Sequence, residues 1–142
     1  MQFKMNKILA GAALLVAAVA AQAQVAVVVN PKSSVGNMTA DQVASIFLGK
    51  SNALPSGNAA VAVDLPENAA ARETFYSKAT GKSSAQVKAA WSRLVFSGKG
   101  TPPKELGSAA EVKKFVAANP DAIGYIEKSA VDGSVKVVLS VE

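Results

Sequence analysis

A continuous run of β-branched and small apolar residues, Val25-Ala26-Val27-Val28-Val29, constrains the fold more than any other segment of the chain. A strand with one solvated face would alternate apolar and polar residues, and this segment does not. We therefore expect a strand that other elements cover on both faces. Covering both faces requires a layered architecture, in which helices lie on the two sides of a sheet.

Three helix starts are predicted by capping boxes, in which a Ser or Thr and a Gln or Glu three residues later satisfy the free amides of the first turn. These pairs are Thr39 with Gln42, Ser83 with Gln86, and Ser108 with Glu111. A fourth helix is expected over residues 69–79. In the helix that begins at Ser83, a helical spacing of apolar residues predicts a buried stripe, with Trp91 in the core rather than exposed as a platform for a sugar; the stripe comprises Val87, Trp91, Leu94 and Val95.

Further strands are expected at residues 59–64, 122–127 and 134–141. The Asp132-Gly133 turn precedes the last of these, and its alternate residues Val135, Val137, Leu139 and Val141 are expected to share one face. We expect the closing two strands to form a hairpin on one edge. The order β-α-β-α-α-α-β-β predicts a single α/β domain with a mixed sheet flanked by helices.

Residues 1–23 have the three parts of a secretory signal peptide. Lys4 and Lys7 form a cationic head, an uncharged apolar run covers residues 8–20, and Ala21-Gln22-Ala23 fits a signal-peptidase site. The alternative is a membrane anchor, but the run is shorter than the ~20 residues that a spanning helix needs. We therefore expect a mature domain of residues 24–142 in the periplasm, with no membrane span after cleavage.

The composition excludes several kinds of site. The 142 residues include no cysteine and no histidine, which removes His-based triads, zinc sites built on His or Cys, and disulfides. Serine is abundant, but no Gly-x-Ser-x-Gly motif is present, and a Ser–Lys dyad has no recognisable pattern. We expect a protein that is not an enzyme, with no metal and no cofactor.

The charge is weakly basic, with 15 Lys and Arg against 10 Asp and Glu. The lysines are scattered and Lys113-Lys114 is the only adjacent pair, so we expect no nucleic-acid partner. The loop at residues 97–103 contains Gly and Lys but lacks the spacing of a phosphate-binding loop, and it is expected to be an ordinary turn. The positive surface favours an anionic ligand only through its field.

Two loops offer donors for a ligand, because ligands gather beyond the carboxyl ends of strands in layered α/β domains. The loop after residues 25–29 carries Ser33 and Ser34, and the loop after residues 59–64 carries Asn68 and leads to Arg72. Hydroxyls, an amide and a bidentate guanidinium at a helix start would suit an anion. The alternative is structural: Asn68 caps its helix, Arg72 pairs with neighbours or solvent, and the serines form turns.

The chain also resembles a known family, the phosphate-type substrate-binding proteins of ABC importers, and in particular its short, single-domain members. The resemblance covers nearly the whole mature chain, and the segments at residues 46–50 and 122–126 are together its most specific part. The segments that carry it are Val27-Val28-Val29-Asn30-Pro31, Met38-Thr39 through Ile46-Phe47-Leu48-Gly49-Lys50, Arg72-Glu73-Thr74-Phe75, Trp91, Lys99-Gly100-Thr101-Pro102-Pro103 and Ala122-Ile123-Gly124-Tyr125-Ile126.

The resemblance implies a lobe of the type II periplasmic-binding-protein fold. In full-length relatives two lobes close on an oxyanion, which is held by the loop after the first strand and by an Arg-containing Ser-Gly-Thr loop at a helix start. Here the second loop is Asp64-Leu65-Pro66-Glu67-Asn68-Ala69, so the Ser-Gly-Thr motif is missing. Asp64 and Glu67 would repel phosphate unless one accepts a proton from it or pairs with Arg72.

Size is a second departure, since the 119 residues after position 23 suffice for one compact core, whereas a clamshell needs two. The sequence therefore predicts a secreted, non-catalytic solute-binding protein that takes phosphate or another small oxyanion for ABC-type uptake, with an ABC permease or another envelope protein as a partner. Its candidate ligand residues are Ser33, Ser34, Asn68 and Arg72. Tyr125 is a less favoured candidate, because a buried tyrosine beside a glycine is more often a core residue. The alternative is an envelope protein-interaction module that has kept the fold and lost the ligand.

Overall fold

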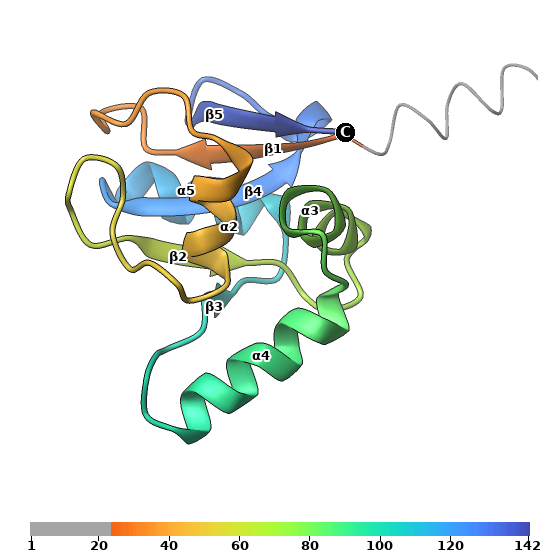
Figure 1. The fold of residues 1–142 in the computed structure, drawn as a ribbon. Coiled ribbons are helices and arrows are strands. Elements are labelled where there is room, and N and C mark those ends of the chain that lie inside the picture. The colour runs from red at the N-terminus through yellow and green to blue at the C-terminus, as the bar shows by residue number, and fades with distance from the viewer. Residues whose placement is uncertain (1–23) are drawn as a thin grey trace, which may run out of the picture.

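The computed structural model describes residues 24–142, so the predicted signal peptide lies outside the described residues. The elements follow one another along the chain as drawn in Figure 1. They are β1 (Val25–Val29), α2 (Ala40–Phe47), β2 (Val61–Asp64), α3 (Ala70–Thr80), α4 (Ser84–Phe96), β3 (Lys104–Glu105), α5 (Ala109–Ala118), β4 (Ala122–Glu127), a 3₁₀ helix (Lys128–Ala130) and β5 (Lys136–Val141).

The strands form one five-stranded sheet in the order β3-β2-β4-β1-β5. β1 pairs antiparallel with both β4 and β5, whereas β2 runs parallel to β4 and to β3. All five residues of β1 are buried, as its unbroken apolar run predicts. The predicted α/β class, with a mixed sheet flanked by helices, is confirmed.

Helices cover both faces of the sheet: α5 lies behind it and α2 in front of it in Figure 1. Gly124 of β4 permits the close approach of α5, because a Cβ there would come within 2.8 Å of methyl groups of Val112 and Val63. The opposite face carries a cluster of four aromatic rings, in which Phe75 stacks on Tyr125 with ring centroids 4.1 Å apart. Phe47 and Tyr76 complete that cluster.

The predicted closing hairpin is wrong, because β1 lies between β4 and β5. The short 3₁₀ helix carries the chain past β1, whose hydrogen-bonding groups are then paired on both edges. The predicted shared face of the last strand is also interrupted. The register between β1 and β5 shifts between Val27 and Val28, skipping Val138, so that Val138 is buried where Val137 and Leu139 are only partly buried.

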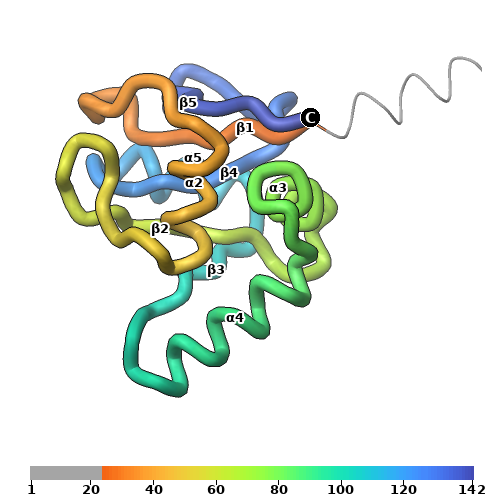
Figure 2. Tube along the Cα trace, viewed as in Figure 1, coloured from red at the N-terminus to blue at the C-terminus, as the bar shows by residue number. Residues whose placement is uncertain are grey.

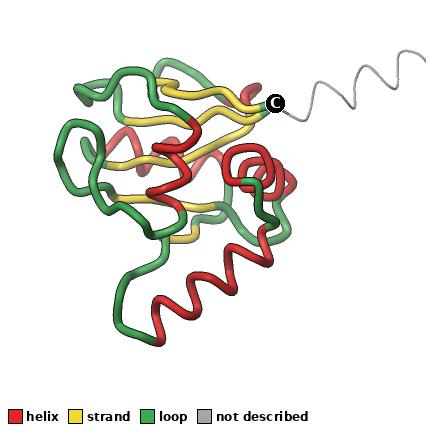
Figure 3. The backbone as a smooth tube through the Cα atoms, in the orientation of Figure 1, coloured by secondary structure: helices red, strands yellow, loops and turns green. Residues whose placement is uncertain are grey.

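Helix α4 differs most from its sequence-based prediction. Of the predicted stripe, only Val87 is fully buried, and Val95 is 49% exposed. Phe96, at the end of the helix, is 95% exposed. Figure 3 shows α4 at the periphery, joined by a long loop to the two-residue strand β3, which the sequence analysis did not predict.

Trp91 of α4 is partly buried rather than a core residue. Its Nε1 donates a hydrogen bond to the carbonyl oxygen of Phe47 at 2.8 Å, which ties α4 to the end of α2.

The two ends of the described chain lie side by side in Figure 2, where the start of β1 meets the end of β5. The side chain of Gln24 donates a hydrogen bond to Glu142 at 3.2 Å. Within residues 24–142, no helix combines the length and the apolar character that a membrane crossing requires.

Candidate functional site

The two loops that the sequence analysis singled out lie at opposite ends of the sheet. β1 is antiparallel to β4 and β2 is parallel to it, so β1 and β2 run in opposite directions. Figure 1 accordingly shows the loop after β1 on the left and the start of α3, which follows β2, on the right. Ser33 and Ser34 are therefore separated from Asn68 and Arg72, and these four residues do not surround one small ligand within this chain.

The loop after β1 is tied into the fold by its own hydrogen bonds. The Asn30 side chain accepts a hydrogen bond from the Lys32 amide and donates to the carbonyl oxygens of Val116 and Ala117 at the end of α5. The Ser33 hydroxyl accepts from the Val35 amide at 3.2 Å. Ser34 is exposed. Ligand contact by Ser33 and Ser34 stays a prediction.

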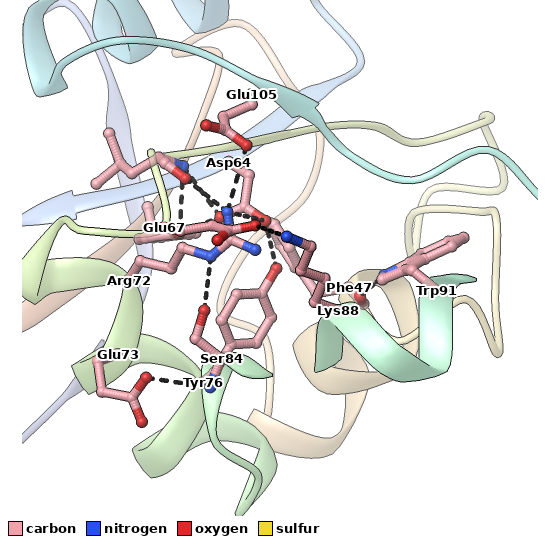
Figure 4. Close-up of polar contacts among 12 residues, drawn as sticks. Phe47, Asp64, Glu67, Arg72, Glu73, Tyr76, Ser84, Lys88, Trp91 and Glu105 are labelled. Atoms are coloured by element: carbon pink, nitrogen blue, oxygen red, sulfur yellow. Dashed lines mark hydrogen bonds and ion pairs between the residues drawn. The ribbon is translucent and has the colours of Figure 1, made fainter. Parts of the chain in front are cut away.

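Arg72 lies in the first turn of α3 and is only 6% exposed. Its Nε donates to the Ser84 hydroxyl at 2.9 Å, and its Nη1 donates to the carbonyl oxygen of Leu65 at 2.8 Å, as Figure 4 shows. Nη1 also lies 3.8 Å from Asp64 and 3.6 Å from Glu105. The other terminal nitrogen, Nη2, makes no hydrogen bond within the described residues, and it is the donor that a ligand could use.

Asp64, at the end of β2, is a buried carboxylate with a full set of partners. It accepts hydrogen bonds from the hydroxyls of Tyr76, at 2.5 Å, and Tyr125, and from the Leu65 amide. Burial, together with the neighbouring negative charge of Asp64, raises the pKa of both tyrosines far above the ordinary value. Tyr125 is therefore a positioning residue inside the core, and Asp64 does not face a ligand as a free charge.

A pocket of about 440 Å³, which we call the Arg72 pocket, opens beside this network. Its charged wall contains Asp64, Arg72, Glu105 and the ion pair between Lys88 and Glu67, whose Nζ and Oε1 are 2.6 Å apart. The hydrogen bond from Lys88 lowers the pKa of Glu67. The apolar wall comes from α4 and the loop after it, and comprises Val87, Trp91, Val95, Phe96, Pro102 and Pro103.

Arg72 is predictable from the sequence, but the residues that hold it are not. Ser84 and Glu105 are 12 and 33 positions away along the chain, and nothing in their local pattern indicates contact with Arg72. Asn68 lies just before α3 and is exposed. The N-cap is Ala69, which offers no side-chain hydrogen bond, so the start of α3 lacks the side-chain cap that α2, α4 and α5 have.

The chemistry available at this site is that of binding. A fixed guanidinium, an uncapped helix start and paired carboxylates can orient a polar solute. No group of three or more acidic side chains suited to holding a metal ion occurs in residues 24–142.

Neither a protein-family model nor a curated protein sequence matches the chain. Several solved structures match its fold. An ABC-type phosphate transport receptor from Vibrio cholerae superimposes with a TM-score of 0.64 and 23% identity. A phosphate ABC transporter substrate-binding protein with bound phosphate from Clostridium perfringens gives 0.65 and 22%, and PstS from Borrelia burgdorferi gives 0.54 and 13%.

Each match covers 80% of this chain but only 44%, 43% and 46%, respectively, of the three solved chains. The chain thus spans less than half the length of the proteins that it resembles. At these identities, the comparisons show that the described residues have the fold of part of a phosphate-type substrate-binding protein.

Proposed function

We propose that this chain is a secreted, non-catalytic solute-binding protein that takes phosphate or another small oxyanion at the start of α3. Arg72 is the principal donor in this proposal, and the Asn68 amide supplies a second. The solved structures that share the fold are named as phosphate receptors or phosphate-binding proteins, which supports a solute-binding role. An ABC permease is the corresponding partner.

The observation that carries the proposal is the immobilised guanidinium beside a pocket. Ser84 and the Leu65 carbonyl hold Nε and Nη1, which leaves Nη2 for a ligand without further loss of side-chain freedom. The repulsion expected from Asp64 and Glu67 is reduced, because Asp64 is bound by two tyrosines and Arg72 while Glu67 is paired with Lys88. Glu105 remains close to Arg72, so we expect modest affinity from one lobe alone.

Thermal unfolding in phosphate, sulfate and arsenate, against chloride at equal ionic strength, tests this proposal. A ligand at ten times its Kd stabilises the folded state by about 1.4 kcal/mol, which raises the Tm by several degrees in a domain of this size. Arg72→Lys keeps the charge but loses the planar fork, and it should remove the rise, as should Asn68→Ala in part. No rise with any oxyanion at millimolar concentration would exclude the proposal.

A second candidate function is protein interaction, and a specific observation favours it. Val95 and Phe96, which form part of the apolar wall of the Arg72 pocket, expose apolar surface at the end of α4. Phe96 is flanked in sequence by Arg93 and Lys99, whereas three acids and two cations line the pocket, so a second copy of the chain fits it with complementary charge. Light scattering on the native protein and on Phe96→Asp tests this candidate.

A further inference from the structure

A second pocket, of about 540 Å³, lies between the α2–β2 connection and the loop after α4. It shares Trp91 and Pro103 with the Arg72 pocket, but its other lining residues are different. Lys50, Ser51 and Asn52 come from the first segment, and Lys99 and Thr101 come from the second. We call it the lysine pocket.

Trp91 sets the distance between the two segments of this pocket. A Cβ at Gly49 would lie 2.9 Å from the indole ring, and a Cβ at Gly100 would lie 3.2 Å from it, so both backbones pack against the ring. The indole Nε1 is itself fixed on the Phe47 carbonyl. Because each glycine is adjacent to a lysine, this packing brings Lys50 and Lys99, which are 49 positions apart, to one pocket.

The electrostatic character of the lysine pocket is opposite to that of the Arg72 pocket. No Asp or Glu is among its lining residues, whereas three acids line the Arg72 pocket. Within the described residues, neither Lys50 nor Lys99 takes part in an ion pair. Two unpaired ammonium groups at one pocket favour a ligand that carries at least two negative charges.

The remaining donors indicate what else such a ligand would carry. The Ser51 hydroxyl is engaged with the backbone of Ala53. The Asn52 amide and the Thr101 hydroxyl have no hydrogen bond within the described part of the chain, so they are free to bind oxygen atoms of a polar body. The volume lies in the range of pockets for whole small molecules, which is more than one phosphate group fills.

We propose that the lysine pocket binds a soluble phosphorylated small molecule with two or more negative charges, its phosphoryl oxygens on Lys50 and Lys99 and its polar body on Asn52 and Thr101. This site is separate from the oxyanion site proposed at Arg72 and does not depend on it. The loop at residues 97–103, expected from sequence to be an ordinary turn, thereby supplies ligand donors without the geometry of a nucleotide-binding loop.

Trp91 is the only tryptophan of the chain and lines this pocket, so its fluorescence reports binding. The purified protein is titrated with inorganic pyrophosphate and with glucose 6-phosphate, against glucose and against sodium chloride at equal ionic strength. Isothermal calorimetry measures the same Kd independently. We expect saturable binding of both phosphorylated probes and none of glucose.

Three double variants distinguish a specific site in the lysine pocket from attraction by the general electrostatic field of the surface. Lys50→Gln with Lys99→Gln should weaken binding at least tenfold, and Lys50→Arg with Lys99→Arg should restore most of it. Lys78→Gln with Lys82→Gln removes the same charge from exposed positions that do not line the pocket, and it should change the Kd less than twofold. Circular dichroism confirms that each variant is folded.

Four results would overturn the assignment. The first is the absence of saturable binding, and the second is equal weakening by the two glutamine variants. The third is loss of binding in Arg72→Lys but not in the Lys50/Lys99 variant, which would place the ligand in the Arg72 pocket. A response to phosphatidic acid vesicles but to neither soluble probe would also overturn it, since the phosphoryl group would then be recognised on a lipid surface.

Discussion

At the scale of single residues, the buried carboxylate of Asp64 governs how the fold responds to alkali. Two tyrosine hydroxyls donate to it, and the pKa of each is raised in the folded state. In the unfolded chain a tyrosine loses its proton near pH 10. The contribution of each tyrosine to the free energy of unfolding is therefore complete below pH 10. It is lost as the pH rises above 10, by about 1.4 kcal/mol per pH unit for each tyrosine.

Tyr76→Phe tests this dependence. The variant loses a hydrogen bond to a buried charge, so we expect a cost of about 1.5–3 kcal/mol at pH 8. Above pH 10 its free energy of unfolding should fall less steeply than that of the native protein, because one of the two raised groups is gone. Urea unfolding at pH 8, 10 and 11 measures both quantities. Parallel slopes for the two proteins would show that Tyr76 ionises as freely in the fold as outside it.

Residue types predicted part of the site, and spatial contacts decided the rest. An arginine one turn into a helix after a strand indicates an anion donor, and the structure does place Arg72 at a pocket. Its partners Ser84, Leu65 and Glu105 belong to three other segments, so only the folded chain shows that most of the guanidinium is already bound. The pairing of Lys50 with Lys99 across Trp91 is equally invisible in sequence.

At the scale of elements, the end of α2 is positioned against α4 by a glycine. Gly49 has a φ of +79°, and a Cβ there would lie 2.8 Å from Leu94 and 2.9 Å from Trp91. Gly57 has a similar φ of +94° but has open space around it. The two positions thus share the backbone requirement and differ only in packing.

Gly49→Ala and Gly57→Ala separate these two effects. Placing Ala in a left-handed conformation costs about 1–2 kcal/mol at either position. Overpacking adds about 1–3 kcal/mol at residue 49 alone, because Trp91 and Leu94 must shift. Urea unfolding should show the larger loss for Gly49→Ala, together with a change in native Trp91 fluorescence that Gly57→Ala lacks. Equal losses of unfolding free energy in the two variants, with an unchanged fluorescence spectrum, would mean that α4 moves to accommodate the added methyl group without cost.

Local sequence patterns predicted where the helices begin better than they predicted which helix residues are buried. The capping boxes at Thr39 and Ser83 are formed as expected, because both partners lie within one turn. At Ser108 only half of the box forms, since the Glu111 side chain accepts a hydrogen bond from the Gly107 amide instead. The apolar stripe of α4 is only partly buried, because periodicity shows which residues share a face but not what lies opposite that face.

At the scale of the whole molecule, the directions of the strands decide which loops lie together, whatever donors those loops carry. The sequence predicted a mixed sheet but not which strands are neighbours, and the place of β1 between β4 and β5 is set by long-range pairing. Because β1 and β2 are antiparallel, two loops with similar donors lie at opposite ends of the domain. A ligand in the Arg72 pocket is consequently out of reach of the loop after β1 within the described residues.

The exposed end of α4 indicates how a second copy of the chain would cover the Arg72 pocket. In a two-fold dimer each Phe96 packs against the apolar wall of the partner's Arg72 pocket, and Arg93 approaches the partner's Glu105. We expect a dimer whose population rises with concentration in light scattering between 10 µM and 500 µM, a working range of about fifty-fold.

A buried aromatic anchor contributes about 2 kcal/mol or more, so Phe96→Asp should weaken the dimer by about thirtyfold. Lys78→Gln, which makes the same change in charge on α3, should leave it intact, and a native protein that is monomeric throughout would contradict the dimer.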